Sequence, residues 1–254
     1  MYNFTPQKNL MNAALYLLKK HNLDDVSALG GGTALAAYYW NHRYSTDIDI
    51  FTHSKQDISL LFRSSKWDSK FRSIMQSLDY KSSKIHPIYT EFVFKDNFKM
   101  QFLSVEDKTD NPYNKVSLWG MDLLVESVEE IIAKKIYFRS HKGNARDLFD
   151  IAIAIHKDPI ILNKFKIPLE KIDELLQTIS IIHEDEKLIA EYIYEIYLMN
   201  PNPEYKDIAT HCIQYLKSFL ESYIEAKNLG IVLTNNELAE IEIYSYSQVI
   251  ETTR

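Results

Sequence analysis

The chain contains little cysteine and has no long hydrophobic run. Cys212 is its one cysteine in 254 residues, which excludes a disulfide framework and favours the reducing cytoplasm. No apolar run approaches the ~18 residues that a membrane-spanning helix needs, and residues 1–10 lack the pattern of a signal peptide. We therefore expect a cytoplasmic protein that makes no membrane contact.

Glycine is also scarce, and half of it stands in one place. Six glycines in 254 residues are well below the usual share of about 7%. Three of the six are consecutive, at residues 30–32, directly after a short apolar run. A chain that avoids glycine elsewhere needs these positions for a left-handed turn or for the close approach of a ligand to the backbone.

Positive charge is limited and uneven. The formal net charge of −6 argues against a generic nucleic-acid coat protein. Residues 1–125 hold 15 Lys and Arg and 13 Asp and Glu, a net charge of +2, which leaves −8 for residues 126–254. Within that acidic half, one stretch holds five basic residues and no acid: Lys134, Lys135, Arg139, Lys142 and Arg146. This local cluster favours a single anionic ligand over a broad polyanion surface.

The first half of the chain alternates predicted helices and strands. Periodicity predicts helices over residues 4–21, 33–40, 57–62 and 69–78, and strands over residues 26–29, 47–51, 89–94 and 98–105. Asp96-Asn97 is a hairpin signal between the last two strands. The expected fold class is α/β (α+β), with a small mixed sheet flanked by helices in an N-terminal domain over residues 1–120.

From residue 126 onward the pattern is helical almost throughout. Helices are predicted over residues 127–141, 146–156, 169–179, 184–199, 205–228 and 236–250. The domain boundary is expected in residues 107–120, which carry Pro112 and several turn-forming residues. Residues 121–254 are therefore predicted to form a C-terminal helical domain.

Two carboxylates share one face of the strand predicted over residues 47–51. Side chains alternate along a strand, so Asp47 and Asp49 point the same way while Ile48 and Ile50 enter the core. Two such carboxylates repel each other unless a cation lies between them, and hard oxygen ligands suit Mg²⁺. The alternative is an ordinary exposed strand with its polar face in water.

The glycine triplet and Thr33 together predict an anion site. A strand, a glycine turn and a helix N-terminus present backbone N–H groups and the positive end of a helix dipole, which suits a phosphate. The Thr33 hydroxyl could add a hydrogen bond, or Thr33 could simply cap the helix of a tight turn. Combined with the nearby carboxylate pair, the arrangement indicates metal–triphosphate binding.

The predicted helix after Ser127 places two cations in an apolar stripe. Lys135 and Arg139 fall between isoleucines on the helix face, and a buried ammonium needs an anionic partner. On the next predicted helix, Asp147 and Asp150 share a face that could approach Lys135. These acids could position the cations or act as a general base, and a plain inter-helix salt-bridge network is the alternative.

Four segments in this order resemble one family. They read LGGGTALA (29–36), RYSTDIDIF (43–51), EEIIAKKI (129–136) and RDLFD (146–150). The chain resembles the AbiEii/AbiGii toxin family of the polymerase-β-like nucleotidyltransferase superfamily, the toxins of bacterial abortive-infection and type IV toxin–antitoxin systems. The resemblance covers roughly residues 25–156, and the helical remainder matches only in general character.

This resemblance implies an enzyme that moves a nucleoside monophosphate from an NTP to an acceptor, with Mg²⁺ or Mn²⁺ as cofactor. The acceptor would be RNA, with tRNA included, or protein, and a cognate antitoxin would be a partner. The helical domain would contribute cations and acids to the cleft. The implied roles are triphosphate binding by Gly31, Gly32 and Thr33; metal binding by Asp47 and Asp49; phosphate contact by Lys135; a later acid at Asp147 or Asp150; and nucleotide contact by Arg43, Ser45, Arg139 and Arg146.

One departure leaves other functions open. The superfamily commonly carries a third carboxylate on a neighbouring strand, and Gln101 stands where that acid is expected. Either Glu91 or the later acids replace it, or acceptor activation is weak. The chain could then be a non-catalytic NTP-binding or interaction protein that docks a partner through Tyr192, Tyr194 and Tyr197. A nucleotidyltransferase with a small-molecule acceptor, as in antibiotic-modifying enzymes, is the second enzymatic alternative.

Overall fold

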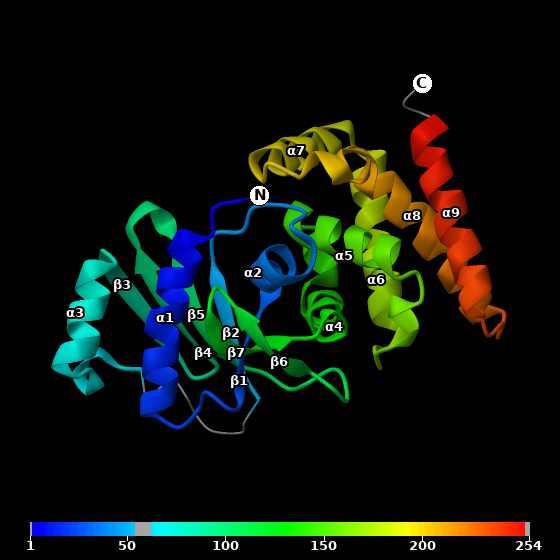
Figure 1. Ribbon diagram of the computed structural model, residues 1–254. Coiled ribbons are helices and arrows are strands. Elements are labelled where there is room, and N and C mark those ends of the chain that lie inside the picture. Colours follow the sequence, from blue (N-terminus) through cyan, green and yellow to red (C-terminus); the bar gives the residue numbers. More distant parts are fainter. Residues whose placement is uncertain (1, 54–61, 252–254) are drawn as a thin grey trace. The chain divides into compact units, whose positions relative to one another are not determined.

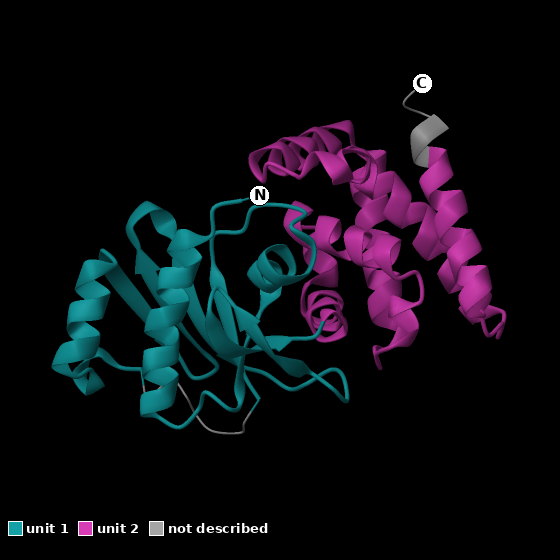
Figure 2. Cartoon of the chain, in the orientation of Figure 1, with its two compact units in different colours: residues 1–127 teal, residues 128–254 magenta. Residues whose placement is uncertain are grey.

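The computed structural model describes residues 2–53 and 62–251 and divides into two compact units (Figure 2). Unit 1 is Met1–Ser127 and unit 2 is Val128–Arg254. The helix predicted over residues 57–62 lies almost wholly outside the described residues. No helix among the described residues is long and apolar enough to cross a membrane.

The described strands of unit 1 form one mixed sheet in the order β3-β4-β5-β2-β1-β7-β6 (Figure 1). Strand β1 pairs antiparallel with β2 and parallel with β7, and β2 pairs parallel with β5. The outer pairs are antiparallel hairpins. The strands are β1 (Ser27–Gly30), β2 (Ile48–Thr52), β3 (Tyr80–His86), β4 (Tyr89–Phe94), β5 (Lys99–Ser104), β6 (Tyr113–Leu118) and β7 (Met121–Glu126). The predicted α/β class with a mixed sheet is confirmed.

One face of this sheet is apolar and is covered by helices. Helices α1 (Thr5–Lys20) and α3 (Ser69–Ser77) contact each other, and they contact β2 and β3 respectively. Ile48, Met100 and Phe92 on adjacent strands are buried completely on this face. Burial of such side chains stabilises the fold by about 1.5–3 kcal/mol each, so the apolar face fixes the register that orients the opposite, polar face.

The helix after the glycine triplet begins two residues earlier than predicted. Helix α2 (Gly31–Ala34) runs directly into η1, a π-helical segment (Leu35–Trp40), and the residue before it is Gly30. Thr33 therefore lies inside the helix and does not cap it. Gly31, the first residue of α2, has a left-handed φ of +61°. Glycine adopts this conformation without the strain that a side chain would cause, so the helix can begin there.

The boundary between the units lies later than predicted. Residues 113–126, which contain the end of the expected linker, form the β6–β7 hairpin, and β7 lies beside β1 in the sheet. The two compact units divide after Ser127, whereas the expected domains were 1–120 and 121–254. The turn-forming residues that suggested a linker form the hairpin, where Trp119 and Gly120 both have positive φ.

Unit 2 is helical, as predicted. Helix α8 packs against α5, α6 and α9, and α5 also contacts α4 and α7. The long helices are α4 (Val128–Arg139), α5 (Ala145–Lys157), α6 (Leu169–Glu184), α7 (Glu186–Leu198), α8 (Lys206–Asn228) and α9 (Asn235–Glu251). Short 3₁₀ turns of the two units are η2 (Ser64–Lys66), η3 (Lys95–Asn97), η4 (Ser140–Lys142), η5 (Ile161–Asn163) and η6 (Pro203–Tyr205).

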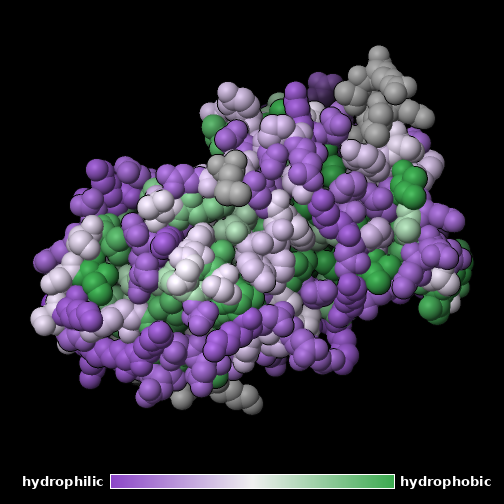
Figure 3. All heavy atoms as spheres, viewed as in Figure 1, coloured by the Kyte–Doolittle hydropathy of each residue, from purple (hydrophilic) through white to green (hydrophobic). Residues whose placement is uncertain are grey.

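The tyrosines singled out on α7 are divided between core and surface. Tyr192 is buried, whereas Tyr194 and Tyr197 are 63% and 77% exposed. The face of the molecule in Figure 3 is mostly hydrophilic, with hydrophobic residues scattered across it. Single exposed apolar residues are usual on globular proteins and indicate no partner by themselves.

Candidate active site

The carboxylate of Asp49 lies against the glycine turn. The register pairs Asp49 of β2 with Gly30 of β1, and a Cβ at Gly31 would overlap Asp49 Oδ2. Asp49 is half-buried, while Ile48 and Ile50 on the opposite face are fully buried. The predicted alternation is therefore confirmed, and the acid is directed toward the start of α2.

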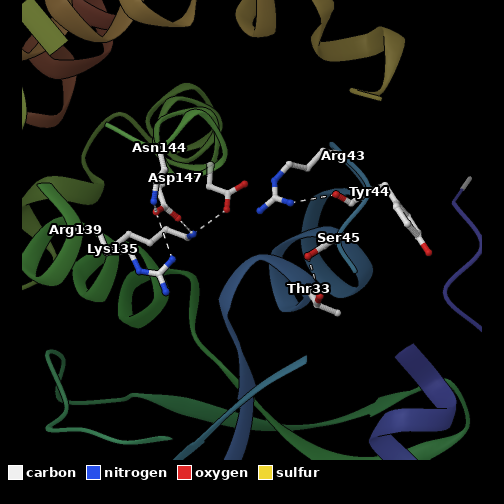
Figure 4. A network of polar contacts seen from close by, with 9 residues as sticks. Thr33, Arg43, Tyr44, Ser45, Lys135, Arg139, Asn144 and Asp147 are labelled. Atoms are coloured by element: carbon white, nitrogen blue, oxygen red, sulfur yellow. Dashed lines mark hydrogen bonds and ion pairs between the residues drawn. The ribbon is translucent and has the colours of Figure 1, made fainter. Parts of the chain in front are cut away.

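Asp47 precedes β2 and is held by short-range contacts. Thr46 Oγ1 donates to Asp47 Oδ1 at 3.2 Å. The Thr33 hydroxyl lies within hydrogen-bond distance of the Asp47 carbonyl and 2.9 Å from the Ser45 hydroxyl. Thr33 is 1% exposed, so its hydroxyl ties α2 to the segment that enters β2. Figure 4 shows the Thr33–Ser45 contact within unit 1.

The segment before Asp47 carries a buried arginine. Arg43 is 2% exposed, and its Nη1 donates to the Tyr44 carbonyl at 3.1 Å. A Cβ at Gly32 would overlap Arg43 Nη2, so the guanidinium lies against the second residue of α2. The structure thus places Arg43 beside Gly32, next to Gly31 in the turn.

Gln7 is a supporting residue that sequence analysis missed. Its Nε2 donates to the Ser45 carbonyl at 2.6 Å and lies 3.2 Å from the Tyr44 hydroxyl, although Gln7 belongs to α1. Gln7 is fully buried. A polar side chain among the apolar positions of an amphipathic helix is the signal that could have identified it. Gln7 anchors the segment that carries Arg43 and Ser45.

Glu126 is a second residue that the sequence did not indicate. It ends β7 and is fully buried, and a Cβ at Gly30 would overlap its Oε2. Tyr39 from η1 donates its hydroxyl to the Glu126 carbonyl at 2.9 Å. This contact fixes η1 to the sheet next to the glycine turn.

A row of polar residues crosses the sheet beside Asp49. The register pairs Asp49 with Gln101 of β5, and Gln101 with Glu91 of β4. Paired residues of adjacent strands point to the same face, so the three side chains lie side by side. Gln101 Nε2 donates to Glu91 Oε2 at 2.6 Å. The amide that replaces the expected acid therefore stands between two carboxylates.

Glu91 is a charged group at the end of this row. It is 5% exposed, and Lys84 Nζ and Lys99 Nζ lie 3.7 and 3.4 Å from its two carboxylate oxygens. Burial alone would raise the pKa of Glu91, but the Gln101 hydrogen bond and the lysines outweigh burial and lower the pKa. A carboxylate with a lowered pKa is a weak base.

In unit 2, Lys135 lies between two buried carboxylates. Its Nζ is 2.5 Å from Asp147 Oδ1 and 3.0 Å from Asp150 Oδ2. Lys135 is 8% exposed and Asp150 is fully buried. Arg139 Nη1 and Asn144 Nδ2 each approach Asp147 Oδ2 at 3.4 Å (Figure 4). The predicted approach of the α5 acids to Lys135 is present.

The electrostatics of this cluster favour the ionised state of Asp147. Burial would raise the pKa of Asp147, but the positive charges of Lys135 and Arg139 outweigh burial, and the pKa is lowered. Arg139 is 47% exposed at its side chain, and Arg146 is exposed. Arg139 thus lies at the margin of the buried cluster.

A second lysine of α4 is buried beside Lys135. Lys134 is 6% exposed and its Nζ lies 2.9 Å from Glu130 Oε1. Phe138, near the end of the same helix, is 42% exposed. Helix α4 is buried around most of its circumference, so a single apolar stripe does not describe it.

The donor set on unit 1 suits a hard divalent cation. No cluster of three or more His, Cys, Asp or Glu that could hold a metal occurs among the described residues. The carboxylates of Asp47 and Asp49 and the amide of Gln101 are oxygen donors, and Mg²⁺ binds few protein carboxylates where phosphates complete its shell. The Asp49 carboxylate lies against the Gly31 backbone, where a Cβ would overlap it. These residues fit Mg²⁺ with a nucleotide.

Comparison with known proteins assigns the chain to a family. The family model described as "Nucleotidyl transferase AbiEii toxin, Type IV TA system" matches residues 13–223. No curated protein matches the chain.

The chain is similar to several solved structures, and the first described here shows the same fold. A protein from Helicobacter pylori described as a nucleotidyltransferase is 19% identical to this chain, with a TM-score of 0.50. The match covers 89% of this chain and 96% of the Helicobacter pylori chain. JHP933 from Helicobacter pylori is 20% identical, with coverage of 87% and 95% and a TM-score of 0.47. The lincomycin-bound lincosamide antibiotic adenylyltransferase LnuA is 15% identical, with coverage of 57% and 92% and a TM-score of 0.36. With most of its length matched by the family model, the chain belongs to the AbiEii nucleotidyltransferase toxin family.

Proposed function

We propose that this nucleotidyltransferase is a toxin that uses Mg²⁺ to transfer a nucleoside monophosphate from an NTP to an RNA or protein acceptor. The observation that carries the proposal is the placement of the Asp49 carboxylate against Gly31, at the start of α2. This placement supports a cation bound by Asp47 and Asp49 beside phosphates bound at the glycine turn.

The reaction has simple bond changes. A hydroxyl oxygen of the acceptor forms a bond to the α-phosphorus of the NTP, and the bond between that phosphorus and the α–β bridging oxygen breaks. Pyrophosphate leaves and the hydroxyl proton passes to a base. When bound, Mg²⁺ would neutralise phosphate charge and polarise the phosphoryl oxygens.

The residues of the chain would bind and orient the substrate. Backbone N–H groups at the start of α2 would donate to phosphate oxygens, because the first N–H groups of a helix have no partner within it. The guanidinium of Arg43 lies beside Gly32 and would add positive charge there. In unit 2, Asp147 and Asp150 hold the ammonium of Lys135, the residue for which the family resemblance implies a phosphate contact.

The proposal is tested by incubating the purified protein with each of four α-labelled NTPs, Mg²⁺, and either total RNA or a protein extract. We expect label in one macromolecular fraction with one preferred NTP, and no label with EDTA. Gln101 specifically favours a second candidate, an NTP-binding protein with little turnover. NTP binding without label in RNA, protein or small molecules would support that candidate and contradict transfer.

A further inference from the structure

The proposed function gives no role to Glu91, although Glu91 is buried next to the site. Its Oε2 accepts a 2.6 Å hydrogen bond from Gln101 Nε2, and Gln101 is paired with Asp49 across β5 and β2. Burying a charged carboxylate is costly unless it is paired and hydrogen-bonded. Lys84 and Lys99 supply the pairing for Glu91.

The chemistry of the two side chains fixes how the Gln101 amide is turned. An ionised carboxylate only accepts hydrogen bonds, whereas the amide of Gln101 has a donor end and an acceptor end. The two lysines keep Glu91 charged, so the NH₂ group of Gln101 must face Glu91. The amide nitrogen and oxygen diverge from the same carbon, so with Nε2 on Glu91 the Oε1 atom does not face that carboxylate.

The strand on the other side of Gln101 is β2, which carries Asp49. Neighbouring strands are about 4.8 Å apart, so an amide oxygen turned toward β2 reaches the zone around the Asp49 carboxylate. A carbonyl oxygen is a ligand for a hard cation, whereas an NH₂ group there would present positive partial charge to it. The orientation of this one amide decides which group the cation meets.

We propose that Glu91 is a positioning residue that holds the Gln101 amide with its oxygen toward the divalent cation bound by Asp47 and Asp49. This inference rests on the proposed function, since it needs the cation at those acids. Glu91 acts through Gln101 and does not replace the missing acid as a base. Gln101 is accordingly a neutral oxygen ligand that needs Glu91 beside it.

The test measures Mn²⁺ binding to the full chain by electron paramagnetic resonance, with no nucleotide present. In E91Q the residue at 91 can donate as well as accept, so the Gln101 amide can turn over. We expect about tenfold weaker Mn²⁺ affinity, because removal of an outer partner of a metal ligand commonly costs 10- to 100-fold. K84M is the matched control: Lys84 is largely exposed and contacts the other Glu91 oxygen, so Lys99 still pairs with Glu91 and the Gln101 bond stays in place.

A double-mutant cycle separates positioning from a general effect on the fold. Q101L removes the proposed ligand, so Q101L and E91Q should lose similar Mn²⁺ affinity, and E91Q/Q101L should lose no more than either. Additive losses would show that Glu91 acts independently of Gln101 and would overturn the proposal. Unchanged Mn²⁺ affinity in E91Q would overturn it as well.

Two further variants keep the outcome interpretable. If E91Q melts at a much lower temperature, the exchange variant E91Q/Q101E replaces it: it restores the pairing of one amide with one carboxylate, and we expect Mn²⁺ affinity at least equal to that of the unaltered chain. Weaker binding by a folded exchange variant counts against the proposal. D49N tests the site itself. Unchanged Mn²⁺ affinity in D49N would overturn the proposed metal site. Weaker Mn²⁺ binding in D49N together with unchanged Mn²⁺ affinity in E91Q would overturn only the role of Glu91.

Discussion

The carboxylate of Asp49 and the backbone of Gly31 lie so close together that no side chain fits between them. Gly31 also has a φ of +61°, which L-residues rarely adopt. The turn and the proposed metal ligand therefore depend on the same glycine, so its substitution affects both at once.

We expect G31A to lose both stability and metal binding. The positive φ costs about 1–2 kcal/mol with a side chain, and the new methyl group displaces the Asp49 carboxylate. G120A is the matched control in the same unit, because Gly120 has a φ of +78° and open space around it. Thermal melts should show a lower melting temperature in both variants. Titration with Mn²⁺ should show weaker affinity in G31A alone. Equal Mn²⁺ affinity in the two variants would contradict the expectation.

Substitution of either acid should abolish transfer while the fold persists. D47N and D49N each remove a charge that a bound cation needs, and metal stabilisation of the transition state is worth several kcal/mol, so transfer should fall by at least about 100-fold. Growth arrest on expression should be relieved in both variants. D122N changes an exposed acid on β7 and should behave as the unaltered chain. Full toxicity of D47N and D49N would exclude metal catalysis at this pair.

Two neighbouring lysines on α4 provide a test of nucleotide contact. Lys135 and Lys134 are similarly buried, and each is paired with a buried acid. Removing one partner of a buried pair costs about 3–5 kcal/mol, so K135M and K134M should both lower the melting temperature. Only K135M should weaken binding of a non-hydrolysable NTP, measured by fluorescence titration. Equal NTP affinity in the two variants would make Lys135 a purely structural residue.

The buried Asp147 should give the protein a defined sensitivity to acid. Its folded-state pKa lies below the ordinary value of 3.8, so its contribution to stability is complete above that value and is lost as the pH falls through the folded-state pKa. The difference in unfolding free energy between the unaltered chain and D147N should be constant near neutral pH and shrink below about pH 4. Denaturant titrations at several pH values measure it, and a difference that stays constant into strong acid would contradict this assignment.

Much of the site could be predicted because its residues follow local rules. The alternation of acids and isoleucines in residues 47–50 places both acids on one face, and three consecutive glycines require an unusual turn. The structure confirms the strand and the turn. The helices of unit 2 were predicted for the same reason, since their apolar periodicity is clear along the chain.

Other features depend on contacts that a single sequence does not display. Strand β3 is mostly exposed and polar, so its pattern lacks the alternation of a half-buried strand. Glu91 and Gln101 are neighbours only through the β4–β5 register, and Lys134 is buried because α4 is enclosed on several sides. These placements arise from tertiary packing, which overrides the local pattern.

The position of β7 has a practical consequence for dissecting the molecule. Although β7 is the last strand in the chain order, it is inserted next to β1 and carries β6 with it. A fragment that stops at Gly120 would expose the hydrogen-bonding edge of β1, and such open edges promote aggregation. Fragments meant to isolate unit 1 should therefore extend at least to Ser127.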